Sequence, residues 1–365
     1  MKILVLNTGS SSVKYRLFDG DRTIAKGLIQ KVGEPGGDAA DHDAALRRIM
    51  TDVDLGGLSA VGHRVVHGGG EFDRATVIDD DVVATIERLV PLAPLHNPPA
   101  LAGIEVARKL LPGVPQIAVF DTAFHATIPA EGTTWAIDAD LAGRWQIRRY
   151  GFHGTSHAYV SRRTAELLDL DPAAADIVTL HLGNGASACA VRGGRSVATS
   201  MGLSPQGGLV MGTRSGDVDP TVVFHLHRVA GMPLDEIEDS LTRHAGMLGL
   251  TGDNDMRAVV ARTDDQARLA LDVYCRRIRE YVGAYLAVLG RADAITFTGG
   301  VGENSAAVRE RSLTGLSGLG IDLDADRNAA GETIISTDNS GIAVCVVATD
   351  EELEIANQSR AALTA

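Results

Sequence analysis

The pattern of apolar and polar residues at the start of the chain predicts a β-hairpin. Four consecutive apolar residues (3–6) end at the polar turn 7–12, and residues 13–17 then alternate with the period of two of a half-buried strand. The turn carries an Asn, a Gly and several hydroxyls, and Lys14 follows it, so it is suited to bind an anion such as phosphate. Ser, Asn and Gly are also ordinary hairpin residues, so the turn alone leaves both interpretations open.

The same pattern returns in the second half of the chain. An apolar run (177–182) ends at the small-residue turn 183–187, and residues 188–192 alternate again. The repeated strand–turn–strand pattern predicts a pair of duplicated lobes with a nucleotide bound between them. The spacing Gly-x-Gly-x-x-Ala at 183–188 also fits a dinucleotide-binding fingerprint, but that motif must open a helix, and a strand pattern follows here.

Further elements follow from the same periodicities. Strands are expected at 23–29, 60–66, 116–120, 294–298 and 342–348, and helices at 43–50, 80–90, 156–168 and 265–289, with a terminal helix after Thr349. Asn97 is expected to cap a helix that has Pro98 near its first turn. A third glycine-rich turn, 299–305, should lead into a helix from about Asn304. The irregular segment 199–216 is long enough to indicate an active-site loop.

Length and composition narrow the possible functions. A chain of 365 residues exceeds one ordinary core, so two domains are expected. The net charge of −13 argues against nucleic acid or an anionic membrane as partner. Three widely spaced cysteines indicate a reducing compartment. The start of the chain lacks a signal-peptide pattern and no apolar run reaches eighteen residues, so a soluble cytoplasmic protein is expected.

Three of these turns together resemble the nucleotide-binding motifs of a known superfamily. Turns 7–12, 183–187 and 299–305 are similar to the phosphate-one, phosphate-two and adenosine motifs of the sugar kinase, heat-shock ATPase and actin superfamily. Within it, five segments in order along nearly the whole chain resemble the signatures of the acetate kinase family: Asn7–Lys14, Gly62–Gly69, Phe120–His125, Arg149–His157 and Met211–Asp217.

The chain departs from the pattern of that family in two places. The region from about residue 30 to 58 is shorter than in most members. Pro205-Gln206-Gly207-Gly208 stands where Pro-Leu-Glu-Gly is typical, beside the expected substrate pocket. The second departure leaves the selectivity for the acid open.

The resemblance implies a fold and an activity. It implies an α/β protein of two duplicated ribonuclease H-like (actin-like ATPase) domains with mixed central sheets and an active-site cleft between them. The expected domains are 1–121, with the C-terminal helix 352–365 packing back on it, and 122–351, expected to bind nucleotide and mediate dimerisation. The implied reaction is reversible in-line transfer of the ATP γ-phosphoryl group to acetate, giving acetyl phosphate and ADP, in acetate and acetyl-CoA metabolism. Magnesium, or manganese in its place, and a homodimer are implied as well.

A site that transfers a phosphoryl group to acetate must bring two anions together. Acetate resembles a Glu side chain, with a pKa of about 4.3, so it is ionised at neutral pH and needs no general base. The difficulty is repulsion between two anions, which positive groups relieve. Arg64 and Arg214 resemble the two catalytic arginines of the family, and His153 the histidine that donates to the phosphoryl group. Asp121 matches an essential aspartate, and we assign it to orienting Arg214 or the water shell of the metal.

The remaining site residues are carried over from the resemblance. Asn7 and Glu351 match metal-associated positions. Glu352 follows Glu351 on a helix, so the two side chains cannot face the same way, and one of them is expected to be exposed to solvent. Four residues that also suit an ordinary core are expected to surround the acetate methyl group: Val66, Leu95, Phe152 and Pro205. The residues expected to bind the nucleotide are Ser10, Ser12, Lys14, His181, Asn184, Gly185, Asp255, Met256, Arg257, Gly300, Val301, Gly302 and Asn304.

Three rival functions are open at this point. A propionate or butyrate kinase differs only in pocket volume, where one methylene is worth about 1–3 kcal/mol. A sugar or glycerol kinase of the same superfamily would need an aspartate base rather than two arginines. An actin-like or chaperone-like ATPase shares the fold, and fold alone does not settle function.

Overall fold

The computed structural model describes residues 1–364, which form two compact units. Unit 1 contains residues 1–126, 154–156 and the C-terminal segment from Asp350, and unit 2 contains 127–153 and 157–349. Unit 1 therefore runs past the boundary expected at residue 121. None of the described helices is long and apolar enough to cross a membrane.

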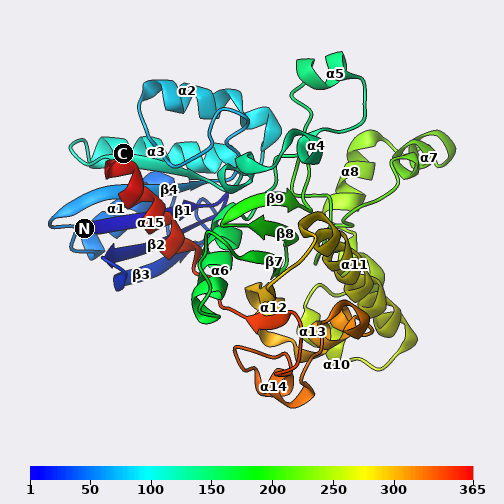
Figure 1. The fold of residues 1–365 in the computed structure, drawn as a ribbon. Coiled ribbons are helices and arrows are strands. Elements are labelled where there is room, and N and C mark those ends of the chain that lie inside the picture. Colours follow the sequence, from blue (N-terminus) through cyan, green and yellow to red (C-terminus); the bar gives the residue numbers. More distant parts are fainter. Residues whose placement is uncertain (365) are drawn as a thin grey trace. The chain divides into compact units, whose positions relative to one another are not determined.

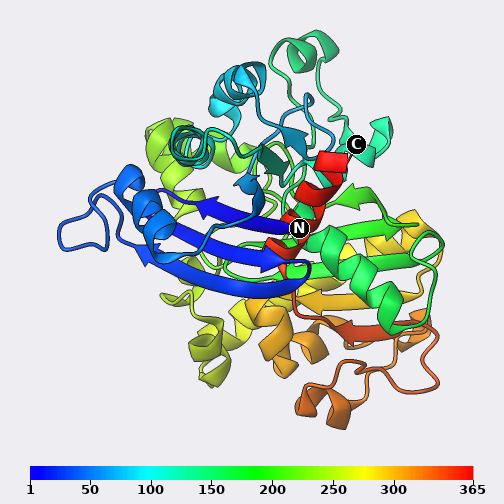
Figure 2. The same cartoon turned by 90° about the vertical axis from the view of Figure 1, so that its left-hand side faces the viewer.

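Unit 1 is built on a six-stranded mixed sheet in the order β3-β2-β1-β4-β6-β5. The strands are β1 (Lys2–Thr8), β2 (Ser12–Asp19), β3 (Arg22–Gln30), β4 (Leu58–Val65), β5 (Thr76–Val77) and β6 (Gln116–Phe120). The first three strands form an antiparallel meander, seen as three long blue strands in Figure 2, whereas β4 runs parallel to β1 and β6 parallel to β4. The predicted hairpin is confirmed.

Helices cover both faces of this sheet, which explains why β1 is apolar at consecutive positions. Leu4 and Leu6 pack with residues of α1 (His42–Asp52), whereas Ile3 and Val5 pack with Ile355 and Ala356 of α15 (Glu351–Thr364). In Figure 1, α15 runs along the blue strands of the sheet. Unit 1 also contains α2 (Asp80–Arg88), η1 (Val90–Leu92) and α3 (Asn97–Leu110), and η2 (Ala123–Thr127) starts at its end.

The predicted cap of α3 was wrong. The N-cap position is occupied by His96, and Asn97 is the first residue of the helix. The Asn97 side chain instead accepts from the backbone N–H of His67 at 3.2 Å and donates to the carbonyl of His67 at 3.1 Å. Asn97 therefore fixes the turn that follows β4, at residues 66–70.

The sheet of unit 2 repeats the strand order of unit 1. Its strands are β7 (Asp176–Leu182), β8 (Ala186–Arg192), β9 (Arg195–Thr199), β10 (Ala294–Thr298) and β11 (Ala343–Val346), in the order β11-β10-β7-β8-β9. Strands β7, β8 and β9 are antiparallel, like β1, β2 and β3, and β10 and β11 run parallel to β7, like β4 and β6 to β1. The duplicated α/β architecture with mixed sheets is confirmed, and β9 is a strand that the sequence did not predict.

The remaining helical segments belong to unit 2. They are α4 (Ala130–Thr133), α5 (Ala139–Arg144), α6 (Gly154–Leu167, whose first three residues belong to unit 1), α7 (Thr221–Val229), α8 (Leu234–Thr242), α9 (Gly246–Thr251), α10 (Met256–Ala261), α11 (Asp265–Leu289), α12 (Gly299–Asn304), α13 (Ala306–Leu313), η3 (Ser317–Leu319) and α14 (Ala325–Ala330). Ala165 of α6 packs against Ile177 and Ala294, and α11 lies against β7 and β8.

The third glycine-rich segment differs from the prediction. Residues 299–304 are helical rather than a turn that precedes a helix. Gly299 has φ +78°, and a Cβ there would lie 2.7 Å from the carbonyl oxygen of Leu182. Glycine therefore lets the chain turn directly from β10 into α12 while touching β7.

Candidate active site

Arg64 and Asp121 form a bidentate ion pair at the C-terminal ends of two neighbouring strands of the unit 1 sheet. Arg64 is near the end of β4, and Asp121 directly follows the parallel neighbour β6. The Arg64 Nε donates to Asp121 Oδ1 at 3.0 Å and Nη2 donates to Oδ2 at 2.6 Å, with the Asp121 side chain 1% exposed. This geometry fixes the guanidinium plane and leaves Nη1 outside the pair. Asp121 thus orients Arg64, a pairing that the sequence did not predict, and its expected role toward Arg214 or the water shell of the metal stays a prediction.

Two glutamates of α15 also act on Arg64. Burial alone would lower the pKa of Arg64, but the charges of Asp121, Glu351 and Glu352 raise it above its ordinary value. Glu351 accepts from the Thr155 hydroxyl at 3.4 Å, and Glu352 forms an ion pair with Lys14. Both glutamates are partly buried. The expectation that one of them is exposed to solvent was therefore wrong.

The donors expected to hold a metal in unit 1 have the right chemistry for magnesium. Asn7 is opposite Lys14 in the register of β1 and β2, and the ammonium group of Lys14 contacts Glu352, the neighbour of Glu351. An amide oxygen and a carboxylate are hard oxygen ligands of the kind magnesium takes, with phosphate and water supplying the rest. Among residues 1–364, no group of three or more His, Cys, Asp or Glu side chains is arranged to hold a metal ion.

In unit 2, four candidate residues meet at the turn between β7 and β8. A Cβ on Gly185 would lie 2.9 Å from Nη2 of Arg214 and 3.5 Å from Nε2 of His153, so both side chains reach this glycine. The ring of His153 stacks on that of His181, with centroids 4.3 Å apart. The structure therefore brings together Arg214, His153, His181 and Gly185.

Arg214 is a partly buried cation. Its Nη1 donates to the carbonyl oxygen of Pro205 at 2.5 Å. Within residues 1–364 it forms no ion pair with a carboxylate, and burial lowers its pKa below the ordinary value. A desolvated guanidinium without a carboxylate is a binding site for an anion.

His153 has an unusual backbone conformation. It precedes α6 with φ 57° and ψ 26°, in the left-handed region that side chains other than glycine rarely adopt. Its Nδ1 is 2.9 Å from the hydroxyl of Ser187 on β8. A strained residue held by a specific side-chain contact is typical of a functional site.

A cavity of about 770 Å³ lies within unit 2 and has the size of a small-molecule site. Seven of its lining residues are among those expected to bind nucleotide: Asn184, Asp255, Met256, Arg257, Gly300, Val301 and Asn304. Seven others were not predicted: Gly183, Gly212, Met247, Asn254, Val260, Tyr274 and Ser305. Three other residues expected to bind nucleotide, Ser10, Ser12 and Lys14, lie at the first hairpin turn, in unit 1.

Comparison with known proteins agrees with the geometry. The Acetokinase family model matches residues 2–357. This chain belongs to the acetokinase family. Acetate kinase of Streptomyces coelicolor is 53% identical over 393 aligned residues, covering 99% of this chain and 96% of the relative. The crystal structure of Porphyromonas gingivalis acetate kinase superposes with a TM-score of 0.94 at 40% identity, covering 99% of each chain. A propionate kinase from Francisella tularensis gives a TM-score of 0.92 at 38% identity over 98% of each chain.

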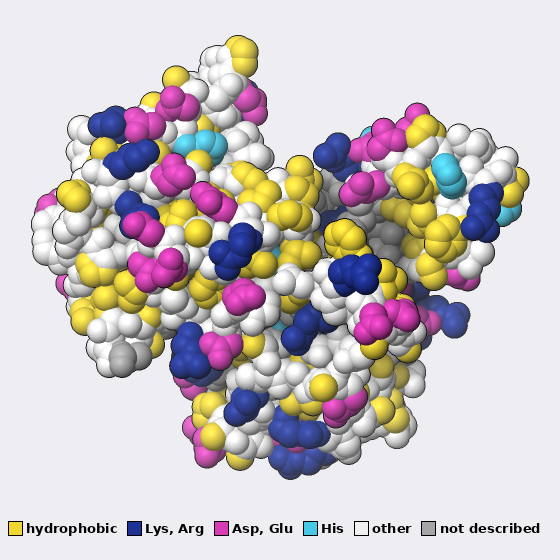
Figure 3. Space-filling view, turned by 90° about the horizontal axis from the view of Figure 1, so that it is seen from above, with side chains coloured by type: hydrophobic (Ala, Val, Ile, Leu, Met, Phe, Trp, Pro, Cys, Tyr) yellow, Lys and Arg dark blue, Asp and Glu magenta, His cyan; other side chains and the backbone are white. Residues whose placement is uncertain are grey.

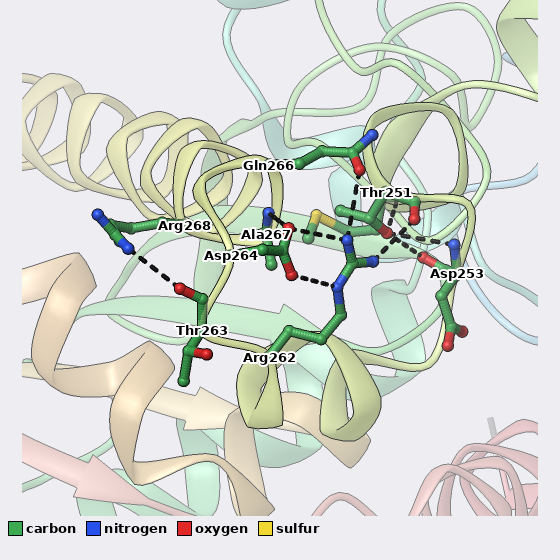
Figure 4. Close-up of polar contacts among 9 residues, drawn as sticks. Thr251, Asp253, Arg262, Thr263, Asp264, Gln266, Ala267 and Arg268 are labelled. Atoms are coloured by element: carbon green, nitrogen blue, oxygen red, sulfur yellow. Dashed lines mark hydrogen bonds and ion pairs between the residues drawn. The ribbon is translucent and has the colours of Figure 1, made fainter.

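The loop of this acetokinase that carries Asp255 is held by a network of polar contacts (Figure 4). Arg262 donates to the carbonyl of Thr251 at 2.8 Å and forms a bidentate pair with Asp264 at 2.8 and 2.9 Å. The Thr251 hydroxyl donates to the carbonyl of Asp253 at 2.9 Å. Asp255 in turn caps α10 and pairs with Arg257. These contacts fix one wall of the cavity.

Helix α12, which forms another wall, is anchored at both ends. The Glu303 carboxylate accepts from the backbone N–H groups of Gly299 at 2.9 Å and Thr349 at 3.2 Å. The buried guanidinium of Arg309 donates to the carbonyls of Gly302 at 2.9 Å and Glu303 at 3.0 Å. Gly300 and Val301 are therefore presented to the cavity by a rigid element.

Tyr274 is a cavity residue that the sequence did not reveal. It lies on α11, is 1% exposed, and its hydroxyl has no hydrogen-bond partner among residues 1–364. Burial raises its pKa, so the hydroxyl stays protonated. At helical spacing among apolar residues, Tyr274 resembles an ordinary core residue, and no sequence signal separates the two roles.

The residues expected to surround the acetate methyl group differ in burial. Phe152 is buried, Val66 and Pro205 are partly buried, and Leu95 is 62% exposed. Pro205 is linked to the catalytic candidates because its carbonyl holds Arg214. Three predicted residues, His181, Gly185 and Gly302, lie outside the lining of the nucleotide-sized cavity.

Proposed function

We propose that this chain is an acetate kinase, which transfers the γ-phosphoryl group of ATP to acetate and forms acetyl phosphate and ADP reversibly. The observation that carries the proposal is the side-chain cluster at the β7–β8 turn, where the cationic Arg214, without a carboxylate partner among the described residues, lies beside His153. Phosphoryl transfer is catalysed mainly by positioning and charge neutralisation, which such a cluster supplies.

The ion pair of Asp121 favours a carboxylate acceptor over an alcohol. Both Asp121 oxygens accept from Arg64, so Asp121 is not available to remove a proton from a hydroxyl group. Acetate is already ionised and needs no base. Arg64 is assigned to the acetate carboxylate through Nη1, and Arg214 and His153 are assigned to the transferring phosphoryl oxygens.

The cavity of unit 2 is assigned to ATP. Asn184 at the β7–β8 turn meets the phosphates, while Gly300, Val301 and the 255–257 segment surround the adenosine. Tyr274 offers its unpartnered hydroxyl to the base. Ser10, Ser12 and Lys14 of the first hairpin are assigned to phosphate oxygens.

Magnesium is assigned to Asn7 and Glu351 in unit 1. When bound, the ion neutralises phosphate charge and aligns the transferring group. Asn7 contributes a neutral amide oxygen and Glu351 a carboxylate that the Thr155 hydroxyl orients. Asn7→Ala is expected to raise the magnesium concentration needed for half-maximal rate, with an unchanged circular dichroism spectrum.

A homodimer through unit 2 is part of the proposal. Helix α7 has no buried residue although it carries exposed Val222, Phe224 and Val229, and Leu234 of α8 is exposed beside it. Figure 3 shows hydrophobic side chains gathered on the projecting segment at the right that carries α7 and α8 in Figure 1. A second copy of the chain is the proposed occupant of this face. Light scattering should give a dimer, and Phe224→Glu should give a monomer.

A reducing, cytoplasmic location fits the three free cysteines, all of which are buried.

Propionate kinase is the alternative activity, since the Francisella tularensis structure is nearly as similar as that of the acetate kinase. Phosphorus NMR of a mixture of enzyme, MgATP and acetate tests the proposal. A growing acetyl phosphate signal supports it, and hydrolysis of ATP to phosphate without an acyl phosphate contradicts it.

A further inference from the structure

The start of α15 carries three consecutive carboxylates, and β2 supplies cationic partners for two of them. Asp350, Glu351 and Glu352 are adjacent in the sequence. Lys14 forms an ion pair with Glu352, and Nη1 of Arg16 donates to both carboxylate oxygens of Asp350 at 2.8 Å. Lys14 and Arg16 are two residues apart on β2, so their side chains lie on the same face of the strand. The start of α15 is therefore held by one strand at two points.

Glu351, the middle carboxylate, has different surroundings. Among residues 1–364 it forms no ion pair, and its carboxylate accepts from the Thr155 hydroxyl at 3.4 Å. Neighbouring carboxylates repel one another, and the cations beside Asp350 and Glu352 offset that repulsion. Within this turn, Glu351 is thus the carboxylate that β2 leaves without a cationic partner.

The Arg16 guanidinium is itself held in place. Its Nε donates to the Thr23 hydroxyl at 2.8 Å, and its central carbon lies 4.7 Å from the centre of the Phe18 ring. The side chains of Arg16 and Asp350 are 24% and 21% exposed, so salt and water screen the pair only in part. A guanidinium that is fixed on two sides gives its carboxylate partner a defined position.

Asp350 transmits this constraint to the backbone of α15. Its Oδ1 accepts from the backbone N–H of Leu353 at 3.0 Å, and its carbonyl accepts from the backbone N–H of Glu354 at 3.0 Å. These are the contacts of an N-cap residue, which order the first turn of a helix. Glu351 is the first residue of that turn.

We propose that Arg16 is a positioning residue that holds Asp350, and with it the first turn of α15, so that the Glu351 carboxylate is kept in place for a divalent cation. This inference rests on the proposed function, which assigns magnesium to Glu351. The body of α15 is anchored independently, because Ile355 and Ala356 are buried in the core of unit 1. Loss of the Arg16 contact should therefore loosen the first turn without releasing the helix.

The direct test is binding of Mn²⁺ to the full chain in the presence of ADP, measured from the electron paramagnetic resonance signal of the free ion. Arg16→Gln and Asp350→Asn each remove the ion pair, while asparagine is as good an N-cap residue as aspartate. Each variant should bind Mn²⁺ about 10-fold more weakly, the lower end of the loss when a group that orients a metal ligand is removed. The double variant should lose no more than either single variant, because both changes remove the same contact.

Asp21→Asn is the matched control. Asp21 pairs with Arg360 at 3.0 Å, near the other end of α15, so this change also removes an ion pair between the helix and the rest of unit 1. It should leave Mn²⁺ binding unchanged. Arg16→Lys keeps the positive charge beside Asp350 and should bind Mn²⁺ more tightly than Arg16→Gln.

Steady-state kinetics separate this role from a general structural one. In Arg16→Gln and Asp350→Asn, the magnesium concentration for half-maximal rate should rise about 10-fold while the KM for acetate stays unchanged. Wild-type Mn²⁺ binding in both variants overturns the proposal, and so do additive losses in the double variant or an equal rise in the KM for acetate.

Glu351→Gln distinguishes failure of this inference from failure of the proposed function. Unchanged Mn²⁺ binding in Glu351→Gln contradicts the magnesium assignment itself, and the inference with it. Weaker binding in Glu351→Gln together with wild-type binding in Arg16→Gln and Asp350→Asn contradicts only the positioning role of Arg16.

Discussion

The two units share a strand order, but the arginine assigned to the site in each unit has different electrostatic surroundings. In unit 1, Arg64 is held by Asp121 and lies in the field of Glu351 and Glu352. In unit 2, Arg214 has no ion pair among the described residues and lies beside His153. Duplication thus supplies two similar scaffolds, and the proposed function assigns a metal and a carboxylate to the side chains of unit 1 and a phosphate to those of unit 2.

Removing the two arginines gives the largest expected effect and the sharpest test of this difference. Arg64→Ala and Arg214→Ala should each lower kcat by about 10³-fold or more, the range of an arginine that stabilises phosphoryl transfer. Only Arg64→Ala should also destabilise the fold, by about 3–5 kcal/mol, because it leaves the buried carboxylate of Asp121 unpaired. Kinetics and urea unfolding measure the two quantities.

The lysine variants serve as controls for that pair. Arg64→Lys keeps the positive charge beside Asp121 but loses the forked guanidinium that pairs with both carboxylate oxygens. Its unfolding free energy should therefore be close to that of the wild type, while its kcat should stay as low as that of Arg64→Ala. Equal losses of unfolding free energy in Arg64→Ala and Arg214→Ala would contradict the comparison.

Asp121→Asn addresses the orienting role of the carboxylate. The amide supplies one acceptor instead of two, so Arg64 should be held less firmly and kcat should fall about 100-fold with a higher KM for acetate. The magnesium concentration for half-maximal rate should stay the same. A shifted magnesium requirement with an unchanged KM for acetate would place Asp121 in the water shell of the metal instead.

Tyr274→Phe tests the cavity of unit 2 with a smaller effect. Loss of one hydrogen bond of about 0.5–1.5 kcal/mol corresponds to about 3- to 10-fold weaker ADP binding by calorimetry. Tyr281→Phe is the matched control, since Tyr281 lies on the same helix, bonds to Asp217 and does not line the cavity. Equal effects of the two variants would remove Tyr274 from the nucleotide site.

Val66→Ala gives the smallest expected change. A wider pocket should raise the kcat/KM ratio of propionate to acetate by about fivefold, the lower end of what one methylene contributes. Val65→Ala is the control, because Val65 lies next to Val66 in sequence but is buried in the core of unit 1. An unchanged ratio in Val66→Ala contradicts the pocket assignment.

Local patterns in the sequence predicted most strands, because alternation directly records which side of a strand is buried. Both hairpins and the bounds of α11 followed from such patterns. The ion pair of Asp121 with Arg64 did not follow from a local pattern. The two residues are 57 positions apart in the sequence, and their pairing depends on the register of β4 against β6. The helical form of 299–304 depends on the contact between Gly299 and Leu182, which is equally remote.

The candidate site shows the same limit. Motif resemblance named Arg64, Arg214 and His153, but the hydrogen bonds to Ser187, His157 and Thr179 join residues of α6, β7 and β8 that only the fold brings together. Tyr274 was missed because its place on α11 has the spacing of a core residue. The sequence therefore predicted which residues belong to the candidate site, and only the fold shows which side chains contact them.

Hydroxylamine trapping tests the central claim most directly, because hydroxylamine converts an acyl phosphate into a coloured hydroxamate. Enzyme, ATP and magnesium would be incubated separately with acetate, propionate, butyrate and glycerol. The proposed function predicts most hydroxamate from acetate, less from propionate and none from glycerol. Absence of hydroxamate from all three acids, with ATP still consumed in the presence of glycerol, would contradict a carboxylate kinase.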